Sequence, residues 1–154
     1  MSEPRLKLLL VASGGGHLQQ LLWLRSWWSQ HDRCFVTFDA PEARAWLADE
    51  RWIAGHGPTN RSLSAAARNT LLARRVLRRE RPDVVVSTGA GIALPFLLLA
   101  RSAGAVAVWV ETWDRVDAPS LTGRLVGPRV DAFVVQRREQ LHFHPRAVCL
   151  GPIR

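Results

Sequence analysis

The sequence predicts one α/β domain built on a doubly wound, Rossmann-like parallel sheet. Short apolar runs alternate along the chain with longer segments that have helical periodicity. The apolar runs do not alternate polar and apolar residues, which is typical of strands buried on both faces of a parallel sheet. The chain has 154 residues, of which 47% are hydrophobic, and this suits a single domain over residues 1–154.

The expected elements follow one another as strand and helix. We expect strands at residues 6–12, 34–38, 83–87, 105–110 and 132–135, and a minor strand at residues 52–54. Helices are expected at residues 18–30, 41–49, 62–80, 92–102 and 120–126. Right-handed crossovers then place helices on both faces of the sheet. Ligands bind such sheets beyond the carboxyl ends of the strands, at the loops 13–17, 87–91, 111–120 and from 136 onward.

The charge balance favours an anionic partner. Lys and Arg number 21 against 13 Asp and Glu, so the formal net charge is +8. Phosphate groups or an acidic membrane face would suit this charge, although an arginine-rich, solvated surface explains it equally well. No recognition motif or aromatic and basic platform points to nucleic acid, so we expect no nucleic-acid partner.

The cysteines and apolar runs exclude several other classes of protein. Cys34 and Cys149 lie far apart and belong to no Cys/His cluster, so we expect no disulfide, no metal site, no cofactor and a reducing, cytoplasmic setting. The apolar runs at residues 6–12 and 92–100 are too short to cross a bilayer. Any membrane contact is therefore expected to be peripheral or to pass through a partner.

A glycine loop joins the first strand to the first helix. Ser13 is followed by Gly14, Gly15 and Gly16, which let the backbone approach a ligand closely. The helix that follows offers free N–H groups, so the loop is a candidate cradle for a diphosphate; the alternative is a tight turn without a ligand. His17 stands at the start of the helix, where a neutral imidazole could act as a base or simply serve as a structural cap.

A second loop of the same kind follows the apolar strand at residues 83–87. Thr88, Gly89 and Gly91 supply a hydroxyl and flexible backbone at another helix start. This loop could bind a second part of the same anionic ligand. A well-capped helix start is the equally simple alternative.

An acidic residue ends the next strand. Glu111 directly follows the apolar run 105–110, so its carboxylate is expected in the crevice, where it could accept a proton or hold sugar hydroxyls. A solvated loop acid is the alternative. Arg115, a few residues later, could face phosphate groups.

The first helix carries more apolar surface than a single sheet contact needs. Trp23, Trp27 and Trp28 extend its apolar stripe around the helix. Tryptophan favours boundaries between apolar and wet surroundings, so we expect these residues at a membrane or partner surface. Burial beneath a neighbouring loop is the alternative.

These motifs together resemble a known family. The segment Ser13–Leu18 resembles the glycine loop of the acceptor domain in GT-B glycosyltransferases, and residues 81–95 are similar to its second half. Further matching motifs follow in order at residues 110–112, 115–116, 120–125, 131–133 and 135–136. The chain resembles PssD-type polysaccharide biosynthesis proteins, bacterial relatives of the membrane-anchor subunit of the eukaryotic two-part dolichol-linked N-acetylglucosaminyltransferase. Residues 149–154 resemble the crossover into a nucleotide-sugar domain, so we expect the donor half on another chain.

The resemblance implies a division of labour. This subunit would bind a polyprenyl-diphosphate-linked sugar at the inner face of the cell membrane, with residues 13–16 and the second loop at the diphosphate. A partner subunit would bind the UDP-sugar, and no metal would be needed. His17 or Glu111 would activate the acceptor hydroxyl, and the sequence does not choose between them. The eukaryotic relatives carry a membrane-spanning helix before the glycine loop, where this chain has only a few residues.

Two rival functions remain at this stage. In an NAD(P)-binding domain, Gly14 and Gly16 would be the first two glycines of the dinucleotide fingerprint, and Asp39 would contact the ribose. The third glycine position, however, is Gln19. The other rival is a non-catalytic scaffold that recruits a transferase to the membrane.

Overall fold

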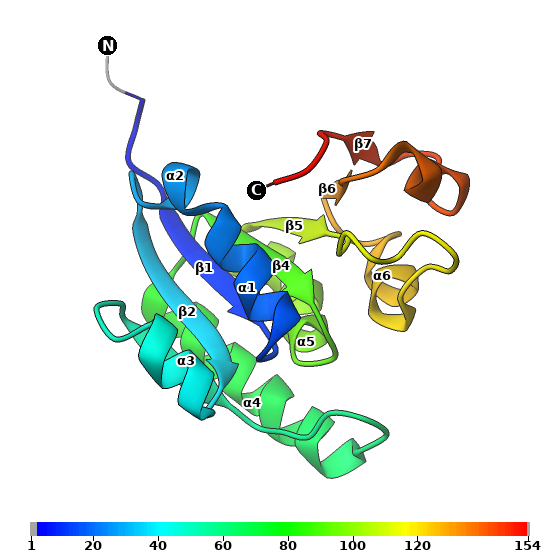
Figure 1. Cartoon of the computed structure of the whole chain (residues 1–154). Coiled ribbons are helices and arrows are strands. Elements are labelled where there is room, and N and C mark those ends of the chain that lie inside the picture. Colours follow the sequence, from blue (N-terminus) through cyan, green and yellow to red (C-terminus); the bar gives the residue numbers. More distant parts are fainter. Residues whose placement is uncertain (1–2, 154) are drawn as a thin grey trace.

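Seven parallel strands form one sheet in the computed structural model, which describes residues 3–153 (Figure 1). The strands are β1 (Lys7–Ala12), β2 (Asp32–Phe38), β3 (Trp52–Gly55), β4 (Val84–Gly89), β5 (Val106–Val110), β6 (Ala132–Val135) and β7 (Val148–Cys149). Their order is β3-β2-β1-β4-β5-β6-β7, and every pairing is parallel. The predicted Rossmann-like fold is therefore confirmed. Arg154, the last residue of the resembling segment, lies outside the described residues.

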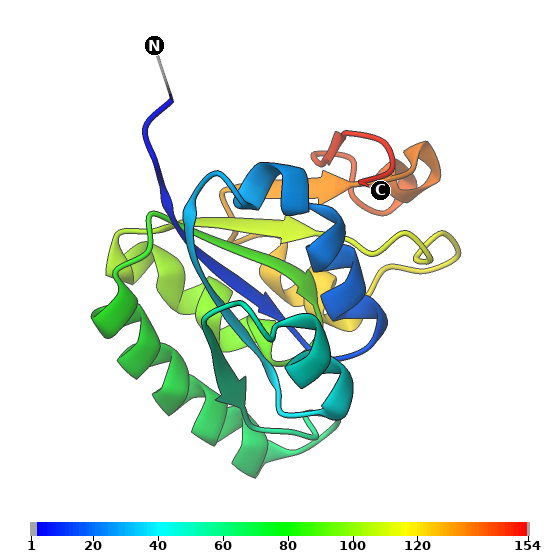
Figure 2. The ribbon, with the colours of Figure 1, turned by 60° about the vertical axis from the view of Figure 1, so that its left-hand side comes forward.

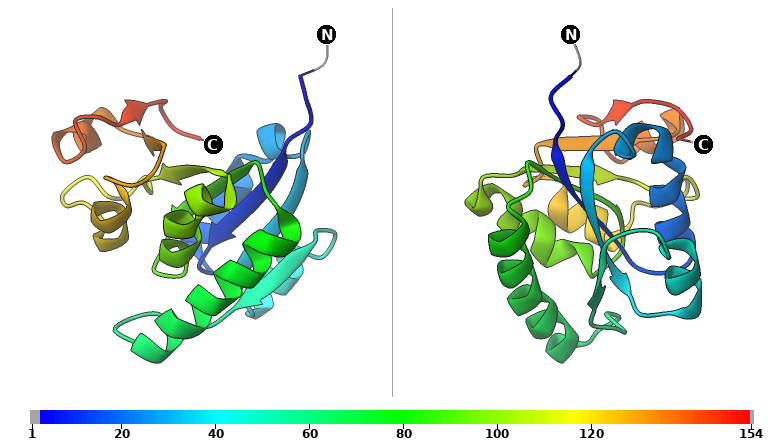
Figure 3. Two further views of the ribbon diagram at one scale, coloured as in Figure 1. Left: turned by 180° about the vertical axis from the view of Figure 1, so that it is seen from behind. Right: turned by 90° about the vertical axis from the view of Figure 1, so that its left-hand side faces the viewer.

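Helices cover both faces of this sheet. They are α1 (Gly16–Trp23), α2 (Arg25–Trp28), α3 (Pro41–Trp46), α4 (Leu63–Glu80), α5 (Ala93–Ala100) and α6 (Leu121–Val126), with 3₁₀ helices η1 (Arg101–Ala103) and η2 (Arg138–His142). The blue and cyan helices α1, α2 and α3 lie on one face (Figure 2). The green helices α4 and α5 lie on the other face, as the edge-on view in Figure 3 shows.

Successive residues of β1 pack into two separate cores, one on each face of the sheet. Leu8 and Leu10 pack with Leu18 and Leu21 of α1 beneath the first face. Leu9 and Val11, one residue out of phase, pack with the α4 and α5 side of the sheet. Strand side chains point alternately to opposite faces, so a strand buried on both faces must be apolar throughout. This is the physical reason for the continuous apolar runs in the sequence.

The single helix predicted at residues 18–30 is two helices in the structure. This changes where one of its tryptophans lies. The chain leaves helical geometry at Leu24, with φ −79° and ψ 13°, and α2 turns back over the sheet. Trp28 is therefore only 1% exposed; its Nε1 donates to Leu21 O at 3.1 Å, and its ring meets Phe35 edge-on. The expectation that Trp28 lies at a membrane or partner surface was wrong. Trp27 is 37% exposed and Trp23 is partly buried.

Two short elements near the end of the chain escaped the sequence pattern. The two-residue strand β7 adds to β6 through pairs such as Val135 with Cys149. A strand this short has no measurable apolar period. The five-residue helix η2 is likewise shorter than the window over which helical periodicity is visible.

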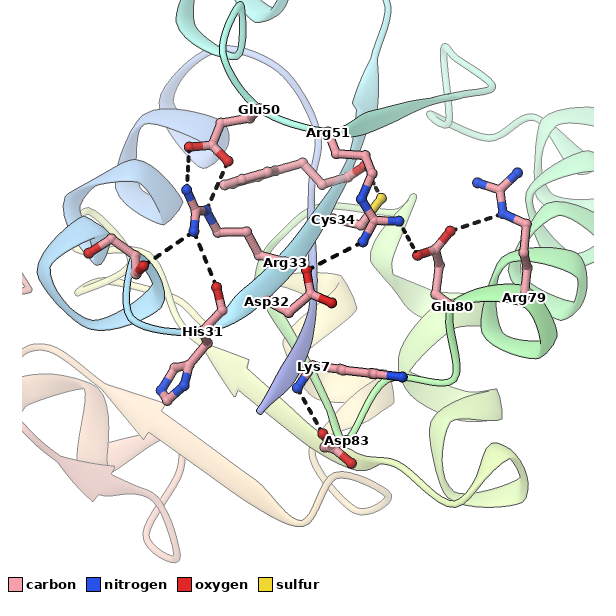
Figure 4. A network of polar contacts seen from close by, with 12 residues as sticks. Lys7, His31, Asp32, Arg33, Cys34, Glu50, Arg51, Arg79, Glu80 and Asp83 are labelled. Carbon is pink, nitrogen blue, oxygen red and sulfur yellow. Dashed lines mark hydrogen bonds and ion pairs between the residues drawn. The ribbon is translucent and has the colours of Figure 1, made fainter. Parts of the chain in front are cut away.

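A polar network closes the edge of the sheet opposite the strands' carboxyl ends (Figure 4). Arg33 binds Glu50 through two hydrogen bonds of 2.8 and 2.9 Å. Glu80, at the end of α4, accepts hydrogen bonds from both Arg51 and Arg79. Burial raises the pKa of the nearby Cys34 thiol to about 11, so this thiol stays protonated at neutral pH. These contacts join β2 and the segment before β3 to the end of α4.

The Glu80 network predicts an acid-sensitive part of stability. Burial opposes ionisation of Glu80, but the hydrogen bonds from Arg51 and Arg79 outweigh it and hold its pKa below the usual value. Because the folded pKa is depressed, this stabilisation is present at neutral pH and is lost as pH falls through the folded pKa. We expect Glu80→Gln to lower the free energy of unfolding by about 1–3 kcal/mol at pH 7 and by much less at acid pH.

Urea unfolding at both pH values measures this difference. Asp49→Asn, at an exposed carboxylate, is the matched control and is expected to have little effect at either pH. An equal loss for Glu80→Gln at both pH values would assign its effect to packing rather than charge.

Candidate functional site

The candidate site lies where the strand order changes direction. β1 and β4 are neighbours in the sheet, yet α1 and α5, which follow them, lie on opposite faces (Figure 1). The two loops diverge there and leave a crevice beyond the carboxyl ends of the strands. The Ser13 N–H donates to Gly89 O at 2.8 Å, so the glycine loop and the second loop are joined directly.

A pocket of about 470 Å³ occupies this crevice. It brings together five residues singled out in the sequence, namely His17, Gly89, Gly91, Glu111 and Arg115. The remaining predicted ligand residues, which do not line it, are Ser13, Gly14, Gly15, Gly16 and Thr88. Residues more than 90 positions apart in the sequence thus meet in one cavity, as the topology requires.

The second loop, which contains Thr88, holds the His17 side chain in one tautomer. Its Nδ1 lies 2.9 Å from Thr88 O, and a carbonyl oxygen can only accept, so Nδ1 carries the proton. The Nε2 atom then keeps its lone pair. The Thr88 hydroxyl donates to His17 O at 2.6 Å, which clamps the residue from a second direction. His17 therefore has the orientation that a general base needs.

Thr88 itself does not have the place that was expected for a diphosphate ligand. Its side chain is fully buried, and its hydroxyl is committed to the His17 carbonyl. The structure corrects its assignment from ligand contact to support of His17. The sequence motif could not reveal this because the partner lies 71 residues away.

Gly89 is required by both backbone geometry and space. Its φ is +119°, a conformation that residues with a side chain rarely adopt. A Cβ atom at this position would lie 2.6 Å from His17 Nδ1, which is closer than any real contact. The absence of a side chain at Gly89 is therefore what lets the imidazole reach Thr88.

The first glycine loop is open in one half and crowded in the other. A Cβ atom on Gly15 or Gly16 would meet nothing within 4 Å, whereas one on Gly14 would lie 3.1 Å from Glu42 Oε1. The carboxylate beside Gly14 disfavours an anion there. An anionic group would fit better at Gly15 and Gly16, where the first N–H groups of α1 have no intrahelical acceptor.

Glu111 is buried in the wall of the pocket. It is 1% exposed, and its Oε2 accepts a hydrogen bond from the Ser120 hydroxyl at 3.0 Å. The same oxygen lies 3.5 Å from His144 Nε2. Its Oε1 is buried and has no hydrogen-bond partner among the described residues. Ser120 also caps α6 by accepting from Gly123 N at 3.0 Å, which ties the carboxylate to the start of that helix.

Three buried glutamines fix the segment that carries Glu111. Gln136 Nε2 donates to Glu111 O at 3.0 Å and to Gln20 Oε1 at 2.8 Å. Gln140 Oε1 accepts from Gln136 N, and its Nε2 donates to Thr112 O at 2.7 Å. These bonds join α1, β6 and η2 to the end of β5. The sequence analysis missed this network because no local pattern identifies a buried glutamine.

The glutamine network predicts a clear loss of stability. We expect Gln140→Leu to lower the free energy of unfolding by about 1–3 kcal/mol, since buried backbone groups at Thr112 and Gln136 lose their partners. Urea unfolding measures the loss. Gln30→Leu makes the same substitution at an exposed glutamine and is the control; we expect it to change the free energy of unfolding little. Equal stabilities for the two variants would contradict the role of the network.

The structure adds a third loop to the pocket. Thr59, Asn60 and Arg61 line it from the connection between β3 and α4. The sequence could have indicated this loop, because a minor strand was expected at residues 52–54 and the carboxyl end of a parallel strand lies at the same edge of the sheet.

Within residues 3–153 no group of three His, Cys, Asp or Glu side chains could hold a metal ion. None of the described helices has the length and apolar character to cross a bilayer.

Comparison with known protein families identifies the chain. Residues 50–153 match the family model described as "Oligosaccharide biosynthesis protein Alg14 like", which covers more than half of the sequence. The chain belongs to this family. The matched region of this Alg14-like chain includes Gly89, Glu111 and Arg115, whereas His17 lies before it. Among curated proteins, no sequence matches the chain.

Solved structures share the fold at low sequence identity. MurG from Acinetobacter baumannii has 18% identity and a TM-score of 0.70, over 88% of this chain and 43% of its own. A glycosyltransferase from Rickettsia africae has 11% identity and a TM-score of 0.72, over 97% and 43%. MnaA of S. aureus, solved with UDP, has 13% identity and a TM-score of 0.76, over 96% and 45%. This Alg14-like chain thus spans less than half of each neighbour and has the Rossmann-like fold of GT-B glycosyltransferases.

Proposed function

We propose that the chain is the acceptor-binding subunit of a two-component, PssD-type glycosyltransferase. In this proposal the subunit holds a polyprenyl-diphosphate-linked saccharide, and a partner protein holds a UDP-sugar. The sugar passes between them in polysaccharide or lipid-linked oligosaccharide biosynthesis. The observation that carries the proposal is the pocket in which His17, Glu111 and Arg115 meet beside two glycine loops, within a family of oligosaccharide biosynthesis proteins.

The charges of the pocket and the glycine loop beside it suit a sugar linked to a diphosphate. Arg115 and Arg61 supply positive charge in the pocket, and Gly15 and Gly16, which do not line it, leave open backbone at the start of α1. Fixed positive groups at this place stabilise a diphosphate without a metal ion. Glu111 also lines the pocket, but its side chain is buried, so it contributes negative charge rather than a hydrogen bond to the sugar. A saccharide bound in this way would have its hydroxyls beside His17.

In the proposed reaction His17 is the general base. Its Nε2 takes the proton of the acceptor hydroxyl while the hydroxyl oxygen attacks the anomeric carbon of the UDP-sugar, and UDP leaves with the bonding electrons. Thr88 O accepts from Nδ1 and steadies the imidazolium that forms. The buried Glu111 carboxylate in the same pocket stabilises this positive charge. The open Nε2 of His17 favours it over Glu111, whose free oxygen is out of contact with solvent.

We also propose peripheral contact with the inner face of the cell membrane, where the lipid-linked acceptor lies. Trp27 is exposed on α2, with Arg25 exposed beside it, and this pairing suits the interface of an acidic bilayer. The dinucleotide-binding alternative has less support. Asp39, which would contact a ribose, is engaged by Arg44 through hydrogen bonds of 2.6 and 2.8 Å.

Reconstitution tests the proposal. The chain alone, and the chain with the product of the neighbouring reading frame, are assayed for transfer from UDP-sugars to a polyprenyl-diphosphate-sugar. We expect transfer only when both proteins are present. Full activity of the pair after both His17 and Glu111 are replaced would support the scaffold alternative. No transfer with any donor, together with NAD binding by this chain, would replace the proposal with the dinucleotide-binding function.

A further inference from the structure

The Glu111 carboxylate forms part of the wall between two cavities. On one side lies the pocket that contains His17. On the other lies a second cavity of about 580 Å³ between α6 and the segment after η2, lined by His144 and by the arginines Arg124 and Arg146. His144 lines this second cavity, and its Nε2 lies 3.5 Å from Glu111 Oε2. The two residues are 33 positions apart and come from separate connections of the fold.

The His144 ring is held in place independently of Glu111. It stacks on Phe133 of β6 with ring centroids 4.2 Å apart and an interplanar angle of 29°. Its side chain is 12% exposed, so the ring has little room to rotate. A stacked ring with one nitrogen directed at a carboxylate can fix the orientation of that carboxylate. Ser120 donates to the same oxygen, whereas Glu111 Oε1 and His144 Nε2 both lack a hydrogen-bond partner among the described residues.

The charges around the pair determine how it can act. Burial lowers the pKa of His144 most strongly, the nearby Glu111 carboxylate raises it, and Arg124 of α6 lowers it; the net direction is downward. A neutral imidazole has a proton on one nitrogen to donate, and at 3.5 Å from Oε2 its Nε2 lies at the limit of hydrogen-bonding distance, with no hydrogen bond formed in this structure. The other charged or titratable side chains that line the two cavities are His17, Arg61 and Arg115 in the first pocket and Asp131 and Arg146 in the second cavity.

We propose that His144 is a positioning residue that orients the buried Glu111 carboxylate for its part in sugar transfer. This inference rests on the proposed function, in which Glu111 stabilises the charge that forms on His17. Without His144, the Glu111 carboxylate would keep only the Ser120 hydroxyl beside Oε2 and could rotate out of its orientation in the pocket.

Two substitutions separate this role from simple packing. His144→Phe keeps an aromatic ring to stack on Phe133 but removes the donor, whereas His144→Gln supplies an amide N–H of similar reach. The matched control is His142→Phe, at an exposed histidine in η2. In the reconstituted pair we expect His144→Phe to lower kcat by about tenfold or more with little change in KM, because the loss is one of transition-state charge. His144→Gln is expected to recover most of kcat, and His142→Phe to match the wild type.

A second measurement needs no turnover. Nitrogen NMR of the intact chain follows the titration of the His144 ring in the wild type and in Glu111→Gln. We expect a proton on Nε2 at neutral pH, and a lower titration midpoint in Glu111→Gln because an attractive charge is removed. An unchanged midpoint, or a kcat for His144→Phe equal to that of His142→Phe in an active pair, would overturn the inference. A shifted midpoint with no transfer in any reconstitution would leave the pairing in place and reject the proposed function instead.

Discussion

Replacing His17 with glutamine is expected to lower kcat of the reconstituted pair by about 10²–10⁴-fold, the range that a general base contributes. A glutamine amide can still donate to Thr88 O, so the loop geometry and the binding of the acceptor should survive. KM should therefore change little. Steady-state kinetics with a polyprenyl-diphosphate-sugar and the matching UDP-sugar measure both constants.

The control for this substitution lies on the same helix. Gln19→Ala changes an exposed residue outside the pocket, so its kinetics should match those of the wild type. If His17→Gln stays within about threefold of the wild type in kcat, His17 is not the base. Glu111 would then take that role, and Glu111→Gln would show the large loss instead.

Replacing Gly89 with alanine is expected to damage both stability and activity. The φ of +119° alone should cost about 1–3 kcal/mol once a side chain is present. The new Cβ would also lie 2.6 Å from His17 Nδ1 and 2.8 Å from its Cε1, so the imidazole must leave Thr88 O. The folded fraction should therefore lose kcat almost as severely as His17→Gln does. Urea unfolding and kinetics at the same temperature separate the two effects.

A second glycine with positive φ separates the effect of backbone strain from that of the clash between a Cβ atom and His17. Gly104 has φ +78°, and a Cβ atom there would meet nothing within 4 Å. Gly104→Ala should cost about 1–2 kcal/mol of stability and leave kcat unchanged. The argument for Gly89 fails if its alanine variant behaves in the same way, with a modest stability loss and normal kinetics.

Most of the fold was predictable from the sequence, because both cores leave a local signature. Runs such as Val84-Val85-Val86 are typical of strands covered on both faces, and the helix at residues 63–80 has a clear polar side. The break at Leu24 was not predictable. Trp23, Trp27 and Trp28 read as one stripe, and only the path of α2 over Phe35 decides that Trp28 is buried and Trp27 exposed.

The site was predictable at the level of loops rather than contacts. The sheet topology was enough to expect His17 and Glu111 at one edge, and the pocket contains both. The roles of Thr88, Ser120 and His144 came only from the structure. Each of them contacts a partner in a different loop of the fold. Sequence spacing does not reveal such pairs, because the residues meet only after the sheet has formed.

The sequence by itself determined the strand and helix order, the two apolar cores and the glycine loops at the strand ends, because these depend on local periodicity and backbone freedom. The tertiary structure decided which polar atoms meet. It places Thr88 O against His17 Nδ1, and Ser120 and His144 against Glu111 Oε2. Hydrogen bonds and charge pairs act over only a few ångströms, so their partners are fixed by packing, which no local segment of the chain encodes.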